Sequence, residues 1–404
     1  MDRKEIWSWS LYDFANSAYG SIVPVLLFPL FYKAVILNNS SNADLWWGIT
    51  VGISVLLAGL IAPIVGAFSD INRKRKTSFI LFTITAIIGT FLLATTGMVS
   101  PILASIIFIL TNMSFGIALG LYDSLLSHVS KKETLGKISG LGYAMGYVGA
   151  IIGTLLVYPL LKQGVGSPEF WISFIIIGVF YFIFSIPSFC FIKENEFDHE
   201  KVEKSKIYTS SFRSVISTIK NWRDNKHILL FLLAFYFLTE GIVTLTYFIS
   251  LYAATTLKIT TTQIAIVFII TQFVSIPSTI ILGRYSDKIG YRKVIISSLF
   301  IFTIATILLS FAKTLTMVYL VAILIGLVLG VAQSNSRAWF TKIIPEEKRS
   351  ELFGFNALAS KISATIGPPL FGLISVATGN QRLAMISIII YFVIALILFY
   401  KAKE

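Results

Sequence analysis

An acid and a base stand in two segments that are otherwise apolar enough to cross a membrane. Glu240 lies roughly twelve residues, or about 18 Å, into segment 228–253, and Lys361 lies about ten residues into segment 352–376. A charge near the bilayer centre is costly unless it faces a cavity or a partner, or is neutralised by a proton. Together the two groups suit a zwitterionic solute. The alternative is a structural pair, or a protonated Glu240 that locks the C-terminal half.

The start of the chain carries a second group of polar side chains. Tyr12, Asn16 and Tyr19 share one face of a predicted helix, and we expect them to line a solute site. Asp13 beside them could bind the solute, cap the helix or act as a cytoplasmic gate, and these alternatives stay open. Further candidates for the cavity are Asn112, Gln272, Gln333 and Asn335. A lone amide in a span also commonly bonds a neighbouring helix, which is the alternative for these four.

A short basic turn occurs twice, as GAFSDINRKRK (66–76) and as GRYSDKIGYRK (283–293). A Gly four residues before an Asp lets a neighbouring helix approach closely, and the Asp can accept hydrogen bonds from the N-terminus of that neighbour. A contact with a neighbouring helix is therefore predicted at Gly66 and Asp70, and again at Gly283 and Asp287. Two more charges near predicted inner ends, Asp123 and Arg337, are expected to gate or, more simply, to anchor helices.

Membrane-spanning helices must position these groups. Hydrophobic residues make up 56% of the 404 residues and charged residues only 13%, a mixture that cannot cover a soluble surface of this size. Spans of about 20 residues are predicted at 9–36, 45–69, 77–97, 101–127, 138–161, 170–192, 228–253, 262–284, 292–312, 315–341, 352–376 and 382–401. We therefore predict an all-α integral membrane protein with twelve transmembrane helices in two pseudo-symmetric six-helix bundles.

The two halves resemble each other beyond the basic turns. SGLGYAMGYVGAIIG aligns with FGFNALASKISATIG, which pairs Tyr147 with Lys361 and makes Tyr147 a further substrate-binding candidate. YDFANSAY likewise aligns with YFLTEGIV and places Asn16 opposite Glu240. The small residues in these stretches let helices pack closely. Paired halves of this kind form the architecture in which a midplane cavity opens alternately to either side.

The distribution of basic residues predicts the orientation. Loops after even-numbered spans are rich in Lys and Arg, whereas the alternate loops are nearly free of them. Both termini and a linker at 193–227 should therefore be cytoplasmic, with the protein in the plasma (inner) membrane. We expect one bundle at 1–192, a linker that carries an amphipathic helix on the inner leaflet, and a second bundle at 228–404.

Composition excludes several other classes of function. The net charge of +13 comes from loops that flank apolar runs, which indicates membrane orientation and no nucleic-acid partner. One Cys and three scattered His give no metal cluster, and we predict no cofactor. No catalytic arrangement at membrane depth and no ATP-binding motif occur, so we predict no enzyme. Aromatic residues such as Trp46 and Trp47 are expected to face lipid or form an interfacial belt.

The two basic turns resemble the loop signature of the major facilitator superfamily, Gly-x-x-x-Asp-Arg-x-Gly-Arg-Arg, which latches the inward-closed or inward-open state in that family. The second copy matches it with Gly283, Asp287, Gly290, Arg292 and Lys293. The first copy has Arg73 where the signature has its middle Gly. The resemblance implies gate or conformational roles for Gly66, Asp70, Gly283, Asp287 and Arg292.

Longer stretches are similar to the vacuolar amino-acid effluxer family linked to autophagy and to its prokaryotic relatives. They include WSLYDFANSAYGSIVPVLLFPLFY, AQSNSRAWFTKIIP and ELFGFNALASKISATIGPPLFGLISVATGNQR, and the similarity runs from the first span to the twelfth. The resemblance implies twelve spans and solute transport, and for the fungal members it implies efflux of neutral amino acids such as leucine. The family's acid-Gly pair in span seven stands here as Glu240 and Gly241, and its Lys in span eleven stands as Lys361.

The function predicted first is secondary transport of a small polar or zwitterionic, amino-acid-like solute by rocking of the two halves. Glu240 would bind an amine or a coupling proton, and Lys361 would meet a substrate carboxylate. The expected partners are the solute, membrane lipids and protons. One alternative is efflux of amphipathic compounds through a broad aromatic cavity. Another is a receptor or scaffold without transport, in which replacing the two charges would leave every phenotype intact.

Overall fold

This computed structural model describes residues 3–72, 74–129, 135–193, 226–343 and 365–402. These residues form helices joined by short loops. The first half contains α1 (Arg3–Ile22), η1 (Val23–Leu27), α2 (Phe28–Phe31), η2 (Tyr32–Ile36), α3 (Ala43–Ile71), α4 (Arg75–Leu93), η3 (Thr96–Met98), α5 (Pro101–Val129), α6 (Leu135–Leu161) and α7 (Pro168–Phe191). The second half contains α9 (Lys226–Thr255), α10 (Thr261–Ile289), α11 (Tyr291–Ser310), α12 (Leu315–Ile343), α14 (Gly367–Thr378) and α15 (Gln381–Lys401).

Eleven helical segments within these ranges are long and apolar enough to cross a membrane. They correspond to eleven of the twelve predicted spans, and the first of them runs from Arg3 to Ile36. The remaining predicted span, 352–376, is described only over its outer part, the shorter apolar helix α14. The protein is thus an all-helical, multi-pass membrane protein of twelve helices, as its apolar runs predict.

Two π-helical turns interrupt the first span. Pro24 lies at the start of η1 and Pro29 lies in α2, and a proline cannot donate the backbone N–H that a regular helix needs. A π-helical turn contains an extra residue and therefore changes which face the following side chains present. The second turn, η2, carries Lys33, whose ammonium group reaches α3.

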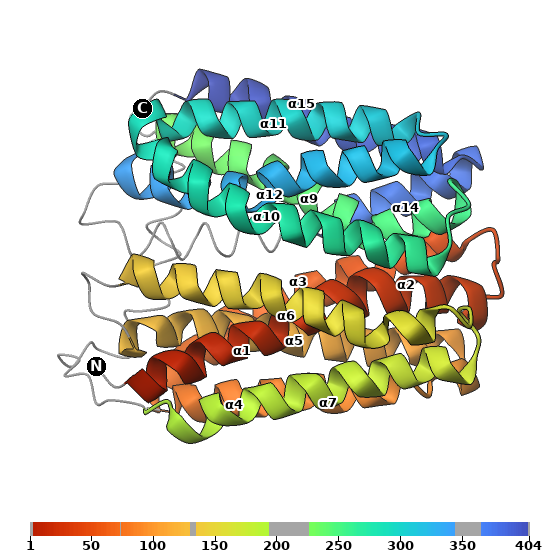
Figure 1. Cartoon of the computed structure of the whole chain (residues 1–404), viewed down its shortest axis with the longest axis horizontal. Coiled ribbons are helices and arrows are strands. Elements are labelled where there is room, and N and C mark those ends of the chain that lie inside the picture. Colours follow the sequence, from red (N-terminus) through yellow and green to blue (C-terminus); the bar gives the residue numbers. More distant parts are fainter. Residues whose placement is uncertain (1–2, 73, 130–134, 194–225, 344–364, 403–404) are drawn as a thin grey trace.

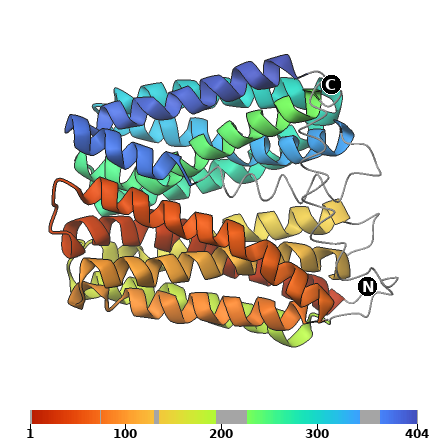
Figure 2. The ribbon, with the colours of Figure 1, turned by 180° about the vertical axis from the view of Figure 1, so that it is seen from behind.

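The helices of the first half lie together on one side of the molecule, and those of the second half lie on the other (Figure 1). The view from behind shows the same division (Figure 2). Two helix pairs form the seam between them, because α3 packs along α14 and α6 packs along α10. The predicted domain limits stay a prediction, since most of the linker 193–227 lies outside the described residues.

The labels N and C stand at the same end of the molecule (Figure 1). We call this the inner end, after the predicted orientation. The opposite end holds the loops 37–42, 94–100 and 379–380, and we call it the outer end.

Glycine residues let the backbones of α3 and α14 come into contact at the seam. A Cβ on Gly48 would collide with the carbonyl group of Pro368, and one on Gly52 would meet the ring of Pro369. From the opposite helix, a Cβ on Gly372 would collide with the backbone of Asp44. Small residues of this kind bring helices close enough for strong van der Waals contact in a membrane.

Close packing at the predicted glycines is confirmed in one helix pair. Gly149 of α6 lies against the backbone of Phe14, and Gly153 lies against the side chain of Ile22. No described atom lies within 4 Å of the place where a Cβ of Gly66 or Gly140 would stand, so close packing at these two glycines stays a prediction. The glycine contacts of α3 with α14 lie in the outer part of α3, and Gly66 lies nearer its inner end.

Candidate functional site

Glu240 meets the N-terminus of α14 inside the second half. The side chain is only 1% exposed, and its Oε1 accepts a hydrogen bond from the backbone N–H of Gly367. Pro368 and Pro369 carry no N–H, and Leu370 donates to the carbonyl group of Ile366. Gly367 therefore supplies the free N–H of this turn, and Glu240 caps it. The positive end of the helix dipole favours the carboxylate at this position.

The second carboxylate oxygen of Glu240 has no hydrogen-bond partner among the described residues. The hydroxyl group of Thr244, one turn further along α9, also has none, and both side chains crowd the Cα of Gly367. Buried polar atoms without partners are rare. Glu240 and Thr244 can together hold a group that donates hydrogen bonds, such as an ammonium group or a proton-carrying water.

A separate cavity of about 170 Å³ lies between α9, α10, α11 and α12, with α1 and η1 forming its remaining wall. Its walls are mainly aliphatic and aromatic. A polar spot comes from Ser21 and Gln272, whose Nε2 donates to the Ser21 Oγ over 3.0 Å. The Oε1 of Gln272 has no partner among the described residues. The cavity suits an apolar group with one hydrogen-bond donor.

Glu240 and this cavity lie on opposite faces of α9. The cavity is lined from α9 by Ile242, Leu245, Thr246 and Ile249. With 3.6 residues per turn, Glu240 and Thr244 point the other way, toward α14. The structure therefore separates Glu240 from Gln272, although the sequence suggests a shared site for them.

The aromatic face of α1 is turned into the first half. The Tyr12 hydroxyl group pairs with Tyr181 at 2.8 Å and with Thr83 at 3.0 Å, and all three side chains are buried. The rings of Tyr19 and Tyr181 stack with centroids 5.6 Å apart. The Tyr19 hydroxyl group and the Asn16 Nδ2 have no partner among the described residues. Their predicted contact with the solute stays a prediction.

The other polar candidates have varied surroundings. Asn112 donates to Ser54 at 2.8 Å and to the Tyr247 hydroxyl group at 3.2 Å, so it links α5 to α9. The Tyr147 hydroxyl group lies against Gly330 of α12. The remaining amides lie on α12, where Gln333 is half-buried and Asn335 is buried and donates to the Val331 carbonyl group.

The charges near the inner end act mostly within one half. Asp13 accepts a hydrogen bond from Ser17 at 3.3 Å and faces Gly142 and Gly146 of α6. Arg292 donates to the Phe399 carbonyl group at 3.3 Å, which ties α11 to α15. Asp123 is exposed on α5. Positions with helical backbone but undescribed side chains are Asp70, Gly283, Asp287 and Arg337, whereas Lys361 lies wholly outside the described residues.

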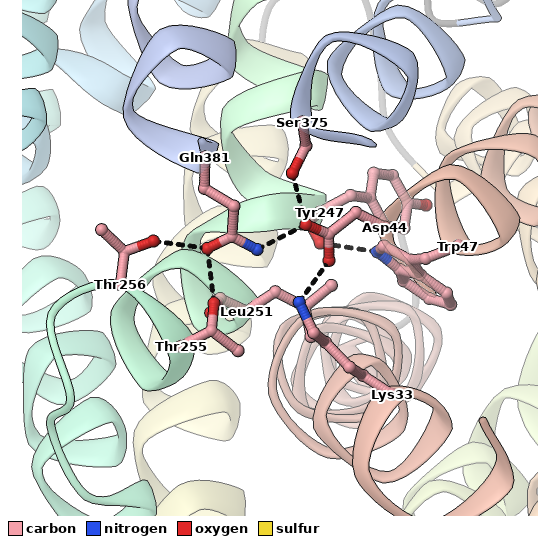
Figure 3. Close-up of polar contacts among 9 residues, drawn as sticks. All are labelled: Lys33, Asp44, Trp47, Tyr247, Leu251, Thr255, Thr256, Ser375 and Gln381. Carbon is pink, nitrogen blue, oxygen red and sulfur yellow. Dashed lines mark hydrogen bonds and ion pairs between the residues drawn. The ribbon is translucent and has the colours of Figure 1, made fainter. Parts of the chain in front are cut away.

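The sequence reasoning missed a polar cluster at the outer end (Figure 3). The Oδ1 of Asp44 accepts from Lys33 at 2.6 Å, and its Oδ2 accepts from Ser375 and Gln381, each at 2.6 Å. Thr255 and Thr256 donate to the Gln381 Oε1. The available signal was a lone acid directly before the predicted span 45–69, together with Lys33 near the end of the preceding predicted span. The cluster joins the first half to the second.

Trp47 belongs to the same junction, which corrects one expectation. Trp46 is 45% exposed, as predicted for an interfacial aromatic residue. Trp47 is fully buried, and its Nε1 donates to the Tyr247 carbonyl group at 2.9 Å. Its prediction as a belt residue is wrong because α9 covers that face of α3.

Known proteins with similar sequences span almost the whole chain. Residues 46–403 match the family described as vacuole effluxer Atg22 like. The chain is similar to an uncharacterized MFS-type transporter, YxiO, of Bacillus subtilis (strain 168), with 27% identity over 98% of this chain and 94% of that protein. It is also similar to autophagy-related protein 22 of Kluyveromyces lactis, with 23% identity over 98% of this chain and 93% of that protein.

Solved structures confirm the predicted fold. A variant of the nucleoside transporter NupG superposes with a TM-score of 0.76 at 13% identity and covers 100% of both chains. A D-xylose-proton symporter superposes with a TM-score of 0.75 at 14% identity over 99% of this chain and 97% of that one. At such identities the likeness shows the major facilitator fold alone. With the family match over most of its length, the chain belongs to the Atg22-like vacuole effluxer family of major facilitator transporters.

Proposed function

We propose that this protein is a secondary transporter of a small polar or zwitterionic, amino-acid-like solute, which it moves by alternating access. The observation that supports this most is the half-paired carboxylate of Glu240. One of its oxygens is held by the Gly367 N–H, and the other has no partner among the described residues. A buried carboxylate oxygen without a partner is energetically costly, and a bound cation or hydrogen-bond donor removes that cost.

An amine or a coupling proton would fit this site at Glu240. An ammonium group would donate to the free oxygen of Glu240 and to the Thr244 hydroxyl group, whereas a proton would neutralise the carboxylate. The solute carboxylate would meet Lys361, which precedes α14 in the same predicted span. Glu240 is closed off in the present conformation, so access to it requires α14 to move relative to α9.

The driving force and the orientation in the membrane belong to the same proposal. A proton gradient would drive the cycle through Glu240, in the plasma (inner) membrane, with both termini in the cytoplasm. This orientation follows from the basic residues that gather in alternate loops.

Efflux of amphipathic compounds is the second candidate, and the apolar cavity favours it. The walls of that cavity would receive a hydrophobic body, and the free Oε1 of Gln272 would bind a single donor. Lipophilic cations would then stabilise the protein more than amino acids do, and Gln272→Leu would weaken the stabilisation.

Flux in proteoliposomes tests the first proposal. A thermal-shift screen of the purified protein against amino acids, peptides, sugars and drugs at two pH values selects the solute. Its uptake is then compared between the parent protein, Glu240→Gln and Thr244→Val. We expect uptake to fall at least about tenfold in both variants, as loss of a charge-assisted hydrogen bond predicts.

Thr303→Val is the matched control, because the Thr303 hydroxyl group bonds the Leu299 carbonyl of its own helix α11, whereas Glu240 bonds Gly367 of α14. Its uptake should equal that of the parent protein. Normal uptake by Glu240→Gln would remove this residue from the mechanism. The absence of any flux in the parent protein, with all phenotypes retained in the variants, would favour a receptor or scaffold.

A further inference from the structure

Asp44 stands where the two halves meet at the outer end. It lies in the first turn of α3, is 4% exposed, and has both carboxylate oxygens occupied. Lys33 of the same half balances its charge over 2.6 Å. The partners of the other oxygen, Ser375 and Gln381, come from α14 and α15 in the second half (Figure 3).

The second half holds its donors ready for this carboxylate. Thr255 and Thr256 donate their hydroxyl hydrogens to the Oε1 of Gln381, which turns the amide NH₂ toward Asp44. Ser375 lies two turns along the rigid helix α14 and donates to the same Asp44 oxygen. The bonds from Ser375 and Gln381 thus converge on a single acceptor that has its own counter-ion.

From this arrangement we infer that Asp44 is a positioning residue for transport, which holds the outer end closed by seating α14 and the start of α15 on the first half. The inference depends on the alternating access proposed above. Opening of the outer end must break the bonds to Ser375 and Gln381, because these cross the seam. The pair with Lys33 lies within one half and persists in both states, so the carboxylate stays neutralised throughout the cycle.

The helix α14 links this closure to Glu240. Its first residue, Gly367, donates to Glu240, and Ser375 near its other end donates to Asp44. A helix of twelve residues moves as one body, so a displacement that opens access to Glu240 also pulls on the bond to Asp44. Events at Glu240 and at the outer closure are therefore mechanically joined.

Distances between paired spin labels test the inference without any solute. In a Cys190→Ser background, labels at Ser41→Cys and Lys313→Cys report on the outer end, and labels at Lys74→Cys and Lys288→Cys report on the inner end. All four positions are exposed. Asp44→Asn removes the charge, whereas Ser375→Ala removes one donor and leaves Asp44 in place.

Both variants should lengthen the outer distance and shorten the inner one. We expect the ratio of outward-open to outward-closed molecules to rise at least about tenfold in Asp44→Asn and several-fold in Ser375→Ala. Thr85→Ala is the control, since this α4 residue is exposed and bonds the Leu81 carbonyl of its own helix. Its distances should match those of the parent protein.

Unchanged distances in Asp44→Asn and Ser375→Ala would overturn the inference. Lengthening at both ends would also overturn it, because that pattern indicates loss of structure and not a shift between two states. Since no solute is added, a failure of the transport proposal at Glu240 leaves this result readable.

Discussion

Two buried carboxylates contact the same helix and differ in how well they are paired. Asp44 at the outer end has a counter-ion and two hydrogen-bond donors, and no oxygen is left over. Glu240, deeper in the molecule, has one donor and one oxygen without a partner among the described residues. A fully paired charge stabilises one arrangement of helices. A carboxylate with one unpaired oxygen can still accept a hydrogen bond from a ligand or take up a proton.

The elements around each carboxylate explain this difference. Asp44 lies where α3, α14, α15 and η2 all supply polar side chains. Glu240 faces the Gly-Pro-Pro start of α14, where proline removes two of the backbone donors that a helix N-terminus usually offers. The comparison predicts that changes at Asp44 act on stability and conformation, whereas changes at Glu240 act on solute and protons.

Asp44→Ala should have the largest effect on stability. It leaves the Lys33 ammonium without its partner and two donors without an acceptor, and removing one member of a buried pair costs about 3 to 5 kcal/mol. Chemical unfolding of the purified protein in detergent measures the loss. Asp44→Asn, which keeps the volume and one acceptor oxygen, should lose less. A loss below about 1 kcal/mol for the alanine variant would contradict the role assigned to this charge.

Gly48→Ala should have the second-largest effect on stability, because it adds a methyl group at the contact between α3 and α14. The added methyl group would collide with the Pro368 carbonyl group, and overpacking of this kind costs about 1 to 3 kcal/mol. Gly66→Ala in the same helix, where no described atom lies within 4 Å of the added methyl group, should be neutral or slightly stabilising. Equal melting temperatures for the two variants would show that the contact of α3 with α14 accommodates the methyl group at position 48 without loss of stability.

Glu240 variants should separate stability from function. Glu240→Ala leaves the Gly367 N–H buried without an acceptor, at a cost of about 1 to 3 kcal/mol. Glu240→Gln keeps an acceptor oxygen and should unfold at nearly the parent temperature while its solute flux is lost. Thermal unfolding and solute flux, measured on the same preparations, check both parts of the prediction. A large loss of stability in Glu240→Gln would make this carboxylate a structural group like Asp44.

Tyr247→Phe should have the smallest effect. It removes the hydroxyl group that accepts from Asn112 but keeps the backbone carbonyl group that accepts from Trp47. A neutral hydrogen bond contributes about 0.5 to 1.5 kcal/mol, so the unfolding midpoint should fall slightly. A loss as large as that of Asp44→Ala would show that the hydroxyl bond to Asn112 holds the two halves together as strongly as the carboxylate does.

The sequence was sufficient for the fold and for part of the site. Long apolar runs predict the spans because no other structure satisfies every backbone group in lipid. Glu240 stands out because an acid in such a run is rare, and the structure does bury it. Asp44 did not stand out, because an acid one residue from a loop is indistinguishable from an ordinary solvated residue until its partners on other helices are known.

The amino-acid sequence by itself determined that this chain is a helical membrane protein of the major facilitator type, with a repeat of two halves. Only the tertiary structure decided that Tyr12 bonds Tyr181 within the first half, that Trp47 is buried, and that Glu240 faces α14 and not the apolar cavity. The physical reason is that hydrophobicity along the chain sets which segments enter the membrane. Which face of a helix meets which neighbour depends on side-chain contacts between residues hundreds of positions apart, as between Asp44 and Gln381.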